Sequence, residues 1–289
     1  MIGLGSMGKR RIRCLQALGV ENIIGFDVRQ DRRTEAHFKE VHVVSKLQIG
    51  LERNPDVAFI CTPPDEHWAS AFVCERAGIP FFTEASVIPI TDLDGHPSCT
   101  MRFWAGPRQV RTAITFGDIG RPLSFVYHVG QYLPDWHPYE DYRTFYVSKR
   151  ATGACREIVP FELCWLTWCF GQVTTVMAYK GKLSDLDCDI DDVYQLLLEF
   201  DGGVRGMLQV DVLAHRAVRH FHLVGSEDDI VLDIKGDESF YVDETRAFLD
   251  AIQGESVWPY TYQHEARVLA VLTAAERSHE EGHRVHLDN

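Results

Sequence analysis

The sequence lacks several features that would fix its class at once. Its 289 residues contain no apolar run long enough to cross a bilayer and no signal-peptide pattern, so we expect neither a membrane partner nor export. None of the eight cysteines belongs to a Cys-x-x-Cys pair, and most stand singly in apolar segments. This usage is typical of reduced thiols in a cytoplasmic protein. An internal repeat and a low-complexity segment are also missing.

The sequence lacks positive charge as well. Its 42 acidic and 29 basic residues give a formal net charge of −13, which argues against a nucleic-acid partner because phosphate binding needs a basic face. The hydrophobic share of 45% is ordinary for a globular protein of two domains. We expect domains at 1–120 and 121–289, with the C-terminal helices able to pack back on the first.

The first eight residues carry the strongest signal. Two apolar residues lead into a turn with the spacing Gly-x-Gly-x-x-Gly, and a helical pattern follows at once. Such a turn presents free N–H groups and a helix dipole to a dinucleotide pyrophosphate, and Asp27, about 20 residues on, is placed to hold a ribose hydroxyl. The turn residues expected at the cofactor are Gly3, Gly5, Ser6, Met7 and Gly8. The alternative is a βαβ turn that uses glycine for geometry alone.

Arginines gather near this turn. Arg10, Arg11 and Arg13 fall on the first helix, and Arg29, Arg32 and Arg33 follow Asp27. They could attract an anionic ligand, although we interpret the helix arginines as a solvated face. Asp27 favours NAD, because its carboxylate would repel a 2′-phosphate, while Arg29 leaves NADP open.

The first 103 residues predict a parallel sheet. Helices are expected at 9–19, 34–39 and 65–77, and strands at 22–27, 56–61, 80–83 and 97–101, an alternation typical of an open parallel α/β sheet. The first strand would hold only Met1 and Ile2, and 88–95 is short for a crossover, so either residues are missing or the first strand is clipped. Ligands bind beyond the carboxyl ends of such strands, which adds Cys61, Thr62, Pro63, Pro64, His67, Glu84 and Ala85 to the expected cofactor residues.

From Pro122 the pattern alternates as in antiparallel strands, with one helix at 161–170, for which Pro160 suits the first helical position and Gly171 the position just past the end. The fold class is therefore α/β, with a parallel N-terminal sheet and a C-terminal α+β domain whose large sheet is mostly antiparallel. Leu196, Leu198, Leu208 and Val210 are interpreted as an exposed apolar stripe through which two or four copies associate.

These motifs resemble the Gfo/Idh/MocA oxidoreductases, the glucose–fructose oxidoreductase and inositol dehydrogenase family. The resemblance rests on the glycine turn of a Rossmann domain, Cys61-Thr-Pro-Pro64 with His67, Thr83-Glu84, Met101-Arg102-Phe103 and the stretch 153–171. It implies NAD or NADP as cofactor and hydride transfer with a sugar, cyclitol or nucleotide-linked sugar.

The sequence departs from that family at its usual acid–base residues. The family has a lysine where this chain has Ala85, and a histidine and an aspartate where it has Phe161 and Cys164. Two hypotheses follow. In one, the base has moved to the polar loop before the helix; in the other, the protein is an inactive sensor of a dinucleotide and a sugar.

Under the first hypothesis, the candidate residues of the polar loop, together with Arg102 of the first domain, have two roles. The candidates for acid–base chemistry are Lys149, Tyr146, His137 and Tyr142, and those for substrate binding are Arg102, Trp136, Tyr139, Arg156 and Glu157. A structural ion pair is the alternative for Arg156 and Glu157. The spacing of His279-Glu-Glu-Gly-His283 matches a zinc motif, but its charged surroundings and Gly282 predict no metal site.

Overall fold

A computed structural model describes residues 1–35, 41–137, 140–235 and 238–287. The chain forms two compact units, Met1–Phe103 with Asp237–Ala266, and Trp104–Gly236 with Arg267–Asn289. The first unit thus ends before the expected boundary at residue 120, and the chain returns to it near the C-terminus.

The first unit holds an all-parallel sheet whose centre is a single residue. β1 pairs with β2, β3 pairs with β4 and β4 pairs with β5, and Ile2 bridges Phe26 on one side and Ile60 on the other. The expected short first strand is therefore confirmed as a one-residue bridge. The strands are β1 (Ile23–Gly25), β2 (Val41–Val43), β3 (Ala58–Ile60), β4 (Phe81–Thr83) and β5 (His96–Pro97).

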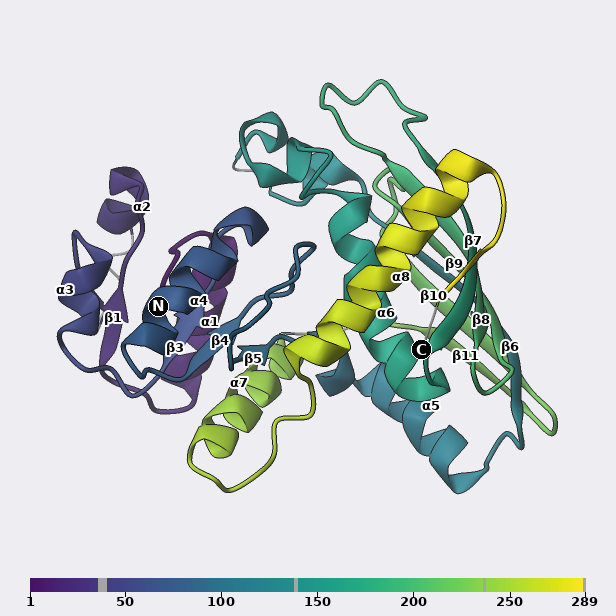
Figure 1. Cartoon of the computed structure of the whole chain (residues 1–289), viewed down its shortest axis with the longest axis horizontal. Coiled ribbons are helices and arrows are strands. Elements are labelled where there is room, and N and C mark those ends of the chain that lie inside the picture. The colour runs from purple at the N-terminus through teal and green to yellow at the C-terminus, as the bar shows by residue number, and fades with distance from the viewer. Residues whose placement is uncertain (36–40, 138–139, 236–237, 288–289) are drawn as a thin grey trace. The chain divides into compact units, whose positions relative to one another are not determined.

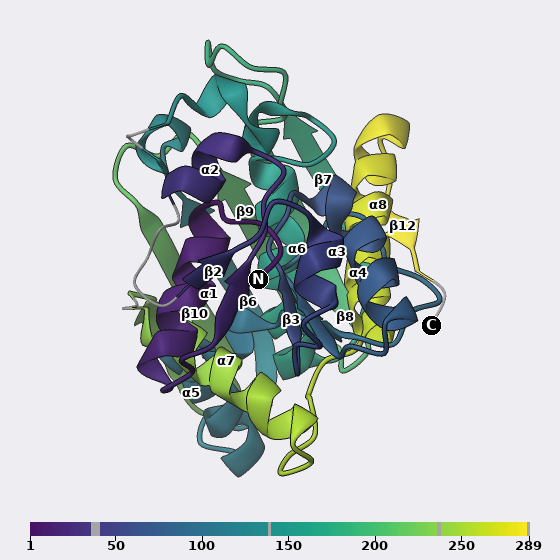
Figure 2. The same cartoon turned by 90° about the vertical axis from the view of Figure 1, so that its left-hand side faces the viewer.

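Helices flank this sheet (Figure 2). They are α1 (Ser6–Ala17), α2 (Gln30–Glu35), α3 (Leu47–Leu51), α4 (His67–Arg76) and α7 (Ser239–Ile252), with 3-10 turns η1 (Pro64–Glu66) and η2 (Thr100–Phe103). The late helix α7 packs against α1 and η2, so the C-terminal return of the chain contacts the helix that follows the glycine turn. The prediction of a strand at 97–101 is wrong beyond Pro97, because Thr100–Phe103 form the 3-10 turn η2. Residues 36–39 of the helix predicted at 34–39 lie outside the described residues.

The second unit contains a sheet in the order β11-β10-β6-β9-β8-β7-β12. Every pair in it is antiparallel except β6 with β9, which confirms the mostly antiparallel prediction. The strands are β6 (Pro122–Gly130), β7 (Val173–Gly181), β8 (Val193–Phe200), β9 (Arg205–Asp211), β10 (Val218–Gly225), β11 (Asp229–Asp233) and β12 (Val285–His286).

Helices cover one face of this sheet: α5 (Ala105–Phe116), α6 (Cys155–Phe170) and the part of α8 (Tyr262–Glu281) that belongs to this unit (Figure 1). Beneath them, the rings of Phe125, Phe170, Phe200 and Phe221 pack together with centroids 5.1–6.5 Å apart in stacked, tilted and edge-to-face pairs. Three short 3-10 turns, η3 (Leu133–Asp135), η4 (Tyr142–Thr144) and η5 (Tyr146–Ser148), form the loop before α6.

The start of α6 differs from the prediction. The helix begins at Cys155, so Pro160 lies inside it rather than at its first position. A proline there removes one hydrogen bond, to the carbonyl of Arg156. The preceding Ala154 has φ of +52°, and a Cβ on Gly153 would lie 2.3 Å from the Val147 carbonyl oxygen, so the chain enters this helix through a tight turn.

The prediction of an exposed apolar stripe on this sheet was wrong. Leu196, Leu198, Leu208 and Val210 are buried under the helices. The alternation along each strand was read correctly, but the two faces were exchanged, because both carry apolar side chains. The open face carries Val126, Met177, Leu197, Met207 and Val231, each 42–59% exposed. In the part of the chain that the structure describes, no helix is long and apolar enough to cross a membrane.

Candidate functional site

The glycine turn in the first unit has the geometry of a phosphate-binding turn. Gly3 has φ of +93°, and a Cβ there would lie 2.6 Å from the Cys61 carbonyl oxygen. A Cβ on Gly8 would lie 2.0 Å from the Gly3 carbonyl oxygen, so α1 approaches the strand as closely as glycine allows. The first turn of α1 begins at Ser6, with Gly5 before it. Its unpaired N–H groups form a site for an anion.

Asp27 closes the other side of this turn. Its Oδ2 accepts a hydrogen bond from the Leu4 N–H at 2.8 Å, and its Oδ1 accepts one from the Arg29 N–H at 2.8 Å. The side chain is buried after β1, at the carboxyl end of the strand. Two backbone donors therefore fix the side chain of Asp27 where a ribose hydroxyl could donate to it.

The arginines that follow Asp27 have different surroundings. Arg29 pairs with Asp31 at 2.6 Å, so its charge is largely matched. Arg32 has Nη1 3.9 Å from Asp27 Oδ2, and the same nitrogen would be 3.1 Å from a Cβ on Gly5. Arg33 donates to the Val28 carbonyl at 2.9 Å. Arg32 is thus the arginine that lies beside the glycine turn.

Buried polar atoms lie at the end of β3. Thr62 Oγ1 and His67 Nδ1 are buried and have no hydrogen-bond partner among the residues that the structure describes. His67 Nε2 hydrogen-bonds the Thr62 carbonyl at 2.9 Å, and burial lowers the pKa of His67 to about 4. The imidazole is therefore neutral at physiological pH. Buried groups without partners are rare in folded proteins, so these two atoms have hydrogen-bonding capacity left for a water or a ligand.

The end of β4 is held by an ion network that the sequence did not reveal. Arg11 is fully buried rather than on a solvated face, with its guanidinium 2.6 Å from Glu84 Oε1 and 2.6 Å from Glu244 Oε2. Glu244 also accepts from the Cys99 N–H and the Thr100 hydroxyl, both at 2.7 Å. Glu84 is thus committed to Arg11, and its proposed contact with a cofactor would have to involve its backbone.

A second acidic residue lies beside the same turn. Glu265, in the first turn of α8, is 4% exposed, and the backbone of Ser86 partly offsets the rise that burial causes in its pKa. Its Oε2 is buried without a partner among the described residues. In the same turn, the Oη of Tyr262, the first residue of α8, lies 3.1 Å from Thr83 Oγ1 at the end of β4. Sequence reasoning missed this carboxyl, because only the fold brings residue 265 to residue 86.

The polar loop of the second unit brings two of its predicted residues together. Tyr146 Oη donates to Glu157 Oε1 at 2.8 Å. Lys149 is exposed and pairs through its backbone with Asp189. Tyr142 Oη accepts from the Asp187 N–H at 3.3 Å. His137 packs against Phe145 with ring centroids 5.5 Å apart.

The expected substrate-binding residues are held in different ways. Arg156 pairs with Glu276 of α8 at 2.7 Å and also donates to the Ala151 carbonyl. Trp136 is half-buried in the loop. Arg102, in the first unit, donates to the Pro259 carbonyl at 3.1 Å and lies over the Tyr260 ring. Tyr139 lies outside the described residues.

On α6, Phe161 is half-buried and Cys164 is buried. Between them, Glu162 is fully buried and accepts hydrogen bonds from Tyr127 at 2.7 Å, Trp165 at 3.0 Å and Arg219 at 2.5 Å. The carboxylate of Glu162 therefore accepts hydrogen bonds from three side chains of the protein itself, which is typical of a structural carboxylate.

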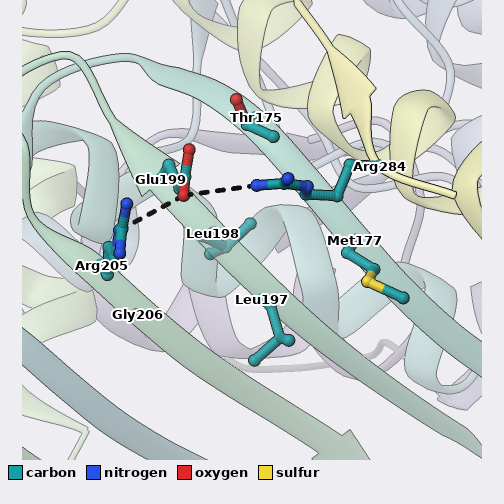
Figure 3. Close-up of a pocket in the computed structure, with 8 residues that line it drawn as sticks. All are labelled: Thr175, Met177, Leu197, Leu198, Glu199, Arg205, Gly206 and Arg284. Atoms are coloured by element: carbon teal, nitrogen blue, oxygen red, sulfur yellow. Dashed lines mark ion pairs between the residues drawn. The ribbon is translucent and has the colours of Figure 1, made fainter.

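A hollow of about 280 Å³ lies on the open face of the second sheet (Figure 3). Met177 and Leu197 contribute apolar side chains to it, and Glu199 lies between Arg205 at 3.3 Å and Arg284 at 3.9 Å. Both arginines are mostly exposed, so this is a surface depression rather than an enclosed binding site.

Residues 108–231 match the model of the GFO/IDH/MocA C-terminal domain. The chain is also similar in structure to a putative NADPH-dependent oxidoreductase from Desulfitobacterium hafniense DCB-2, with 17% identity, a TM-score of 0.85 and coverage of 99% of this chain and 96% of that one. The WlbA dehydrogenase from Bordetella pertussis, in complex with NADH and UDP-GlcNAcA, is similar with 18% identity and a TM-score of 0.85. The match covers 100% of this chain and 98% of that one.

A third structure, levoglucosan dehydrogenase in complex with NADH and levoglucosan, gives 18% identity, a TM-score of 0.84, and coverage of 99% of this chain and 98% of that one. No curated protein sequence matches the chain significantly. At such identities the likeness concerns the fold. The chain therefore has the fold of the Gfo/Idh/MocA dehydrogenases, and the model of that family's C-terminal domain matches its residues 108–231.

Proposed function

We propose that this protein is an oxidoreductase that uses NAD, or less favourably NADP, to transfer hydride to or from a sugar, cyclitol or nucleotide-linked sugar. The observation that carries the proposal is the tight turn from Gly3 to Gly8, in which a Cβ on Gly8 would lie 2.0 Å from the Gly3 carbonyl oxygen, the close helix–strand packing that a dinucleotide-binding turn requires. The substrate class is supported by similar structures, of which one is in complex with NADH and levoglucosan and another with NADH and UDP-GlcNAcA.

The residues of the first unit fit a dinucleotide. The turn from Gly3 to Gly8 would hold the pyrophosphate against the N-terminus of α1, and Asp27 would accept from a ribose hydroxyl. Thr62 Oγ1, buried and without a described partner, offers one hydrogen bond near the nicotinamide end. When bound, the dinucleotide supplies or accepts the hydride. The protein must then bind and orient the substrate and move one proton at its oxygen.

The polar loop of the second unit remains the proposed source of acid–base groups. Tyr146 is the member whose proton already has an acceptor, Glu157 Oε1. Lys149, His137 and Tyr142 are the other candidates. Arg156 forms an ion pair with Glu276. To bind substrate as proposed, its guanidinium would have to contact the ligand while it keeps this ion pair.

A second function is supported by the residues at the family's acid–base positions. Ala85 and Phe161 cannot carry a proton. A protein that kept the dinucleotide turn and lost these groups would be a sensor of dinucleotide and sugar rather than an enzyme.

Absorbance of the nicotinamide band separates the two functions. Protein with NAD or NADH would be mixed in turn with myo-inositol, levoglucosan, UDP-GlcNAcA and other sugars, or with their oxidised forms. Turnover that the Gly8→Ala variant lacks would support the enzyme. Dinucleotide binding without turnover on any substrate would support the sensor, and a chain that binds no dinucleotide would contradict both.

We also propose that copies associate as dimers or tetramers through the open face of the second sheet. Val126, Met207, Leu197 and Met177 form a continuous apolar row across four paired strands, in register from β6 to β7. Such a row on an open sheet is costly to leave in water. A cytoplasmic location is proposed with it, since the eight cysteines are free and seven of them are buried.

A further inference from the structure

Positive charge is left over near one edge of the open face of the second sheet. Arg205 and Arg284 lie on either side of Glu199, with nitrogens 3.3 and 3.9 Å from its Oε1, at the hollow formed by β7, β8 and β9 (Figure 3). The two arginine side chains are 76% and 63% exposed, and they share this single carboxylate. Among the described residues, one unit of positive charge at the hollow therefore has no matching carboxylate.

Negative charge is left over near the other edge. The turn from β10 to β11 exposes Glu227, Asp228 and Asp229 in succession. Asp229 lies 3.1 Å from His222, whereas the carboxylates of Glu227 and Asp228 form no ion pair with any residue that the structure describes. Three consecutive exposed carboxylates repel one another, so cations from outside the chain would stabilise this acidic turn.

The strand register fixes how the two charged groups lie on the sheet. One row across the open face consists of Thr175, Glu199, Arg205, Ser124, Val224 and Asp229, each paired directly with the next. The apolar row lies two residues further along each strand, and it continues from Val126 through His222 to Val231. Both rows have their midpoint between β6 and β9, with β8 and β7 on one side and β10 and β11 on the other.

A second copy of the chain matches this pattern. Identical faces associate about a two-fold axis, and packed sheets keep their strands within about 30° of one another. An axis that runs along the strands, between β6 and β9, places β11 of one copy over β7 of the other. The apolar rows then cover each other, and the acidic turn of each copy lies opposite the partner's arginines.

The alternative two-fold axis runs across the strands and places each strand over its own copy. The apolar rows would meet again, but the row that holds Arg205 and Asp229 would lie over the row of Gln209 and Asp233 on the other side. Asp229 would then face the partner's Asp233, and Arg205 would face an uncharged glutamine. Opposed like charges are unfavourable in an interface, so the charges favour the axis along the strands.

We propose that two copies pack face to face about the axis between β6 and β9, with the turn 226–229 of each copy in the hollow beside Arg205 and Arg284 of the other. The inference rests on the association proposed above and specifies its axis and its charged contacts. The symmetry makes each contact occur twice. The hollow of about 280 Å³ is then filled by side chains of a second copy and not by a small molecule.

Charge reversal in two variants tests this arrangement. One variant carries Arg205→Glu and Arg284→Glu, and the other carries Asp228→Arg and Asp229→Arg; all four side chains are exposed. Each variant alone would set like charges against each other at both contacts. In sedimentation equilibrium, its dimer dissociation constant should therefore be at least about a hundredfold above that of wild type.

An equal mixture of the two variants should associate again. The acidic hollow of the first variant would meet the basic turn of the second, and the unchanged hollow of the second would meet the unchanged turn of the first. Opposite charges then face each other at both contacts of a heterodimer. We expect its dissociation constant to lie within about tenfold of the wild-type value, which also shows that both variants are folded.

The matched control is Arg108→Glu with Arg277→Glu, which makes the same change of charge at exposed positions of α5 and α8 and should keep the wild-type dissociation constant. If either reversed variant alone associates as wild type does, or if their mixture stays dissociated, the arrangement is contradicted while association through this face stands. If wild type is a monomer at every concentration, a second copy does not cover this face and the proposed association itself fails.

Discussion

Arg11 Nε lies 2.6 Å from Glu84 Oε1, and the pair is buried between α1 and the end of β4. Helix α1 and the turn that carries Ala85 and Ser86 are therefore joined by one guanidinium, which Glu244 of α7 also contacts. A single charged side chain thus keeps three separate parts of the first unit in place.

Replacing Arg11 by Met should be severely destabilising. It would leave two carboxylates buried without their cation, which costs about 3–5 kcal/mol of unfolding free energy. Urea unfolding followed by circular dichroism would measure the loss. Arg13→Met, on the same helix but half-exposed and 3.3 Å from Glu238, should cost under about 1 kcal/mol. Equal losses in the two variants would show that the buried network is not what stabilises this unit.

Asp27 should determine which dinucleotide binds. Asp27→Asn removes the charge that repels a 2′-phosphate beside Arg32, so the preference for NADH over NADPH should fall by about tenfold. Fluorescence titration with both dinucleotides measures the ratio. Asp56→Asn, an exposed acid before β3, serves as the control and should leave the ratio unchanged. An unchanged ratio in Asp27→Asn would place the adenosine ribose elsewhere.

Stability should depend on pH through Glu265. Its pKa in the folded chain is about 8, above the ordinary value of 4.5, so the folded state keeps a proton that the unfolded state loses. The stability gained from this group is complete below about pH 4.5 and is lost as the pH rises through about 8. Wild type should therefore lose unfolding free energy relative to Glu265→Gln across this window, which urea unfolding at several pH values would reveal. A constant difference between the two proteins would contradict the raised pKa.

The apolar row on the open sheet predicts the assembly. Leu197→Asp, at a residue that is 54% exposed, should shift the protein to monomers in sedimentation, because a charge would be buried in the contact. Val257→Asp, at a residue that is 90% exposed in the first unit, is the control. If wild type is already a monomer, or if Leu197→Asp keeps the wild-type mass, this face is not the interface.

The sequence predicted those parts of the fold that depend on short-range patterns. The glycine turn, the parallel alternation and the antiparallel strands were predicted because backbone sterics and side-chain alternation act within a few residues. Pro160 was misplaced for a related reason: proline favours a first helical position, but packing of α6 against the sheet tolerates one missing hydrogen bond.

Long-range contacts could not be predicted. Arg11 was interpreted as solvated because nothing in its helix shows that Glu84 and Glu244 would surround it. Glu265 is separated from Ser86 by most of the chain, so no local pattern marks it. The sheet face was exchanged for the same reason, since alternation shows two faces and only the helices decide which one is covered.

The most direct test of the central claim is an equilibrium titration of NADH into wild type, Gly8→Ala and Gly202→Ala, followed by nicotinamide fluorescence. A Cβ on Gly8 would lie 2.0 Å from the Gly3 carbonyl, whereas one on Gly202 would meet only the Phe170 carbonyl at 3.6 Å. We predict saturable binding to wild type and Gly202→Ala, and a loss of at least about a hundredfold in affinity for a folded Gly8→Ala. No binding to wild type, or equal binding to all three proteins, would contradict the assignment of this turn as the dinucleotide site.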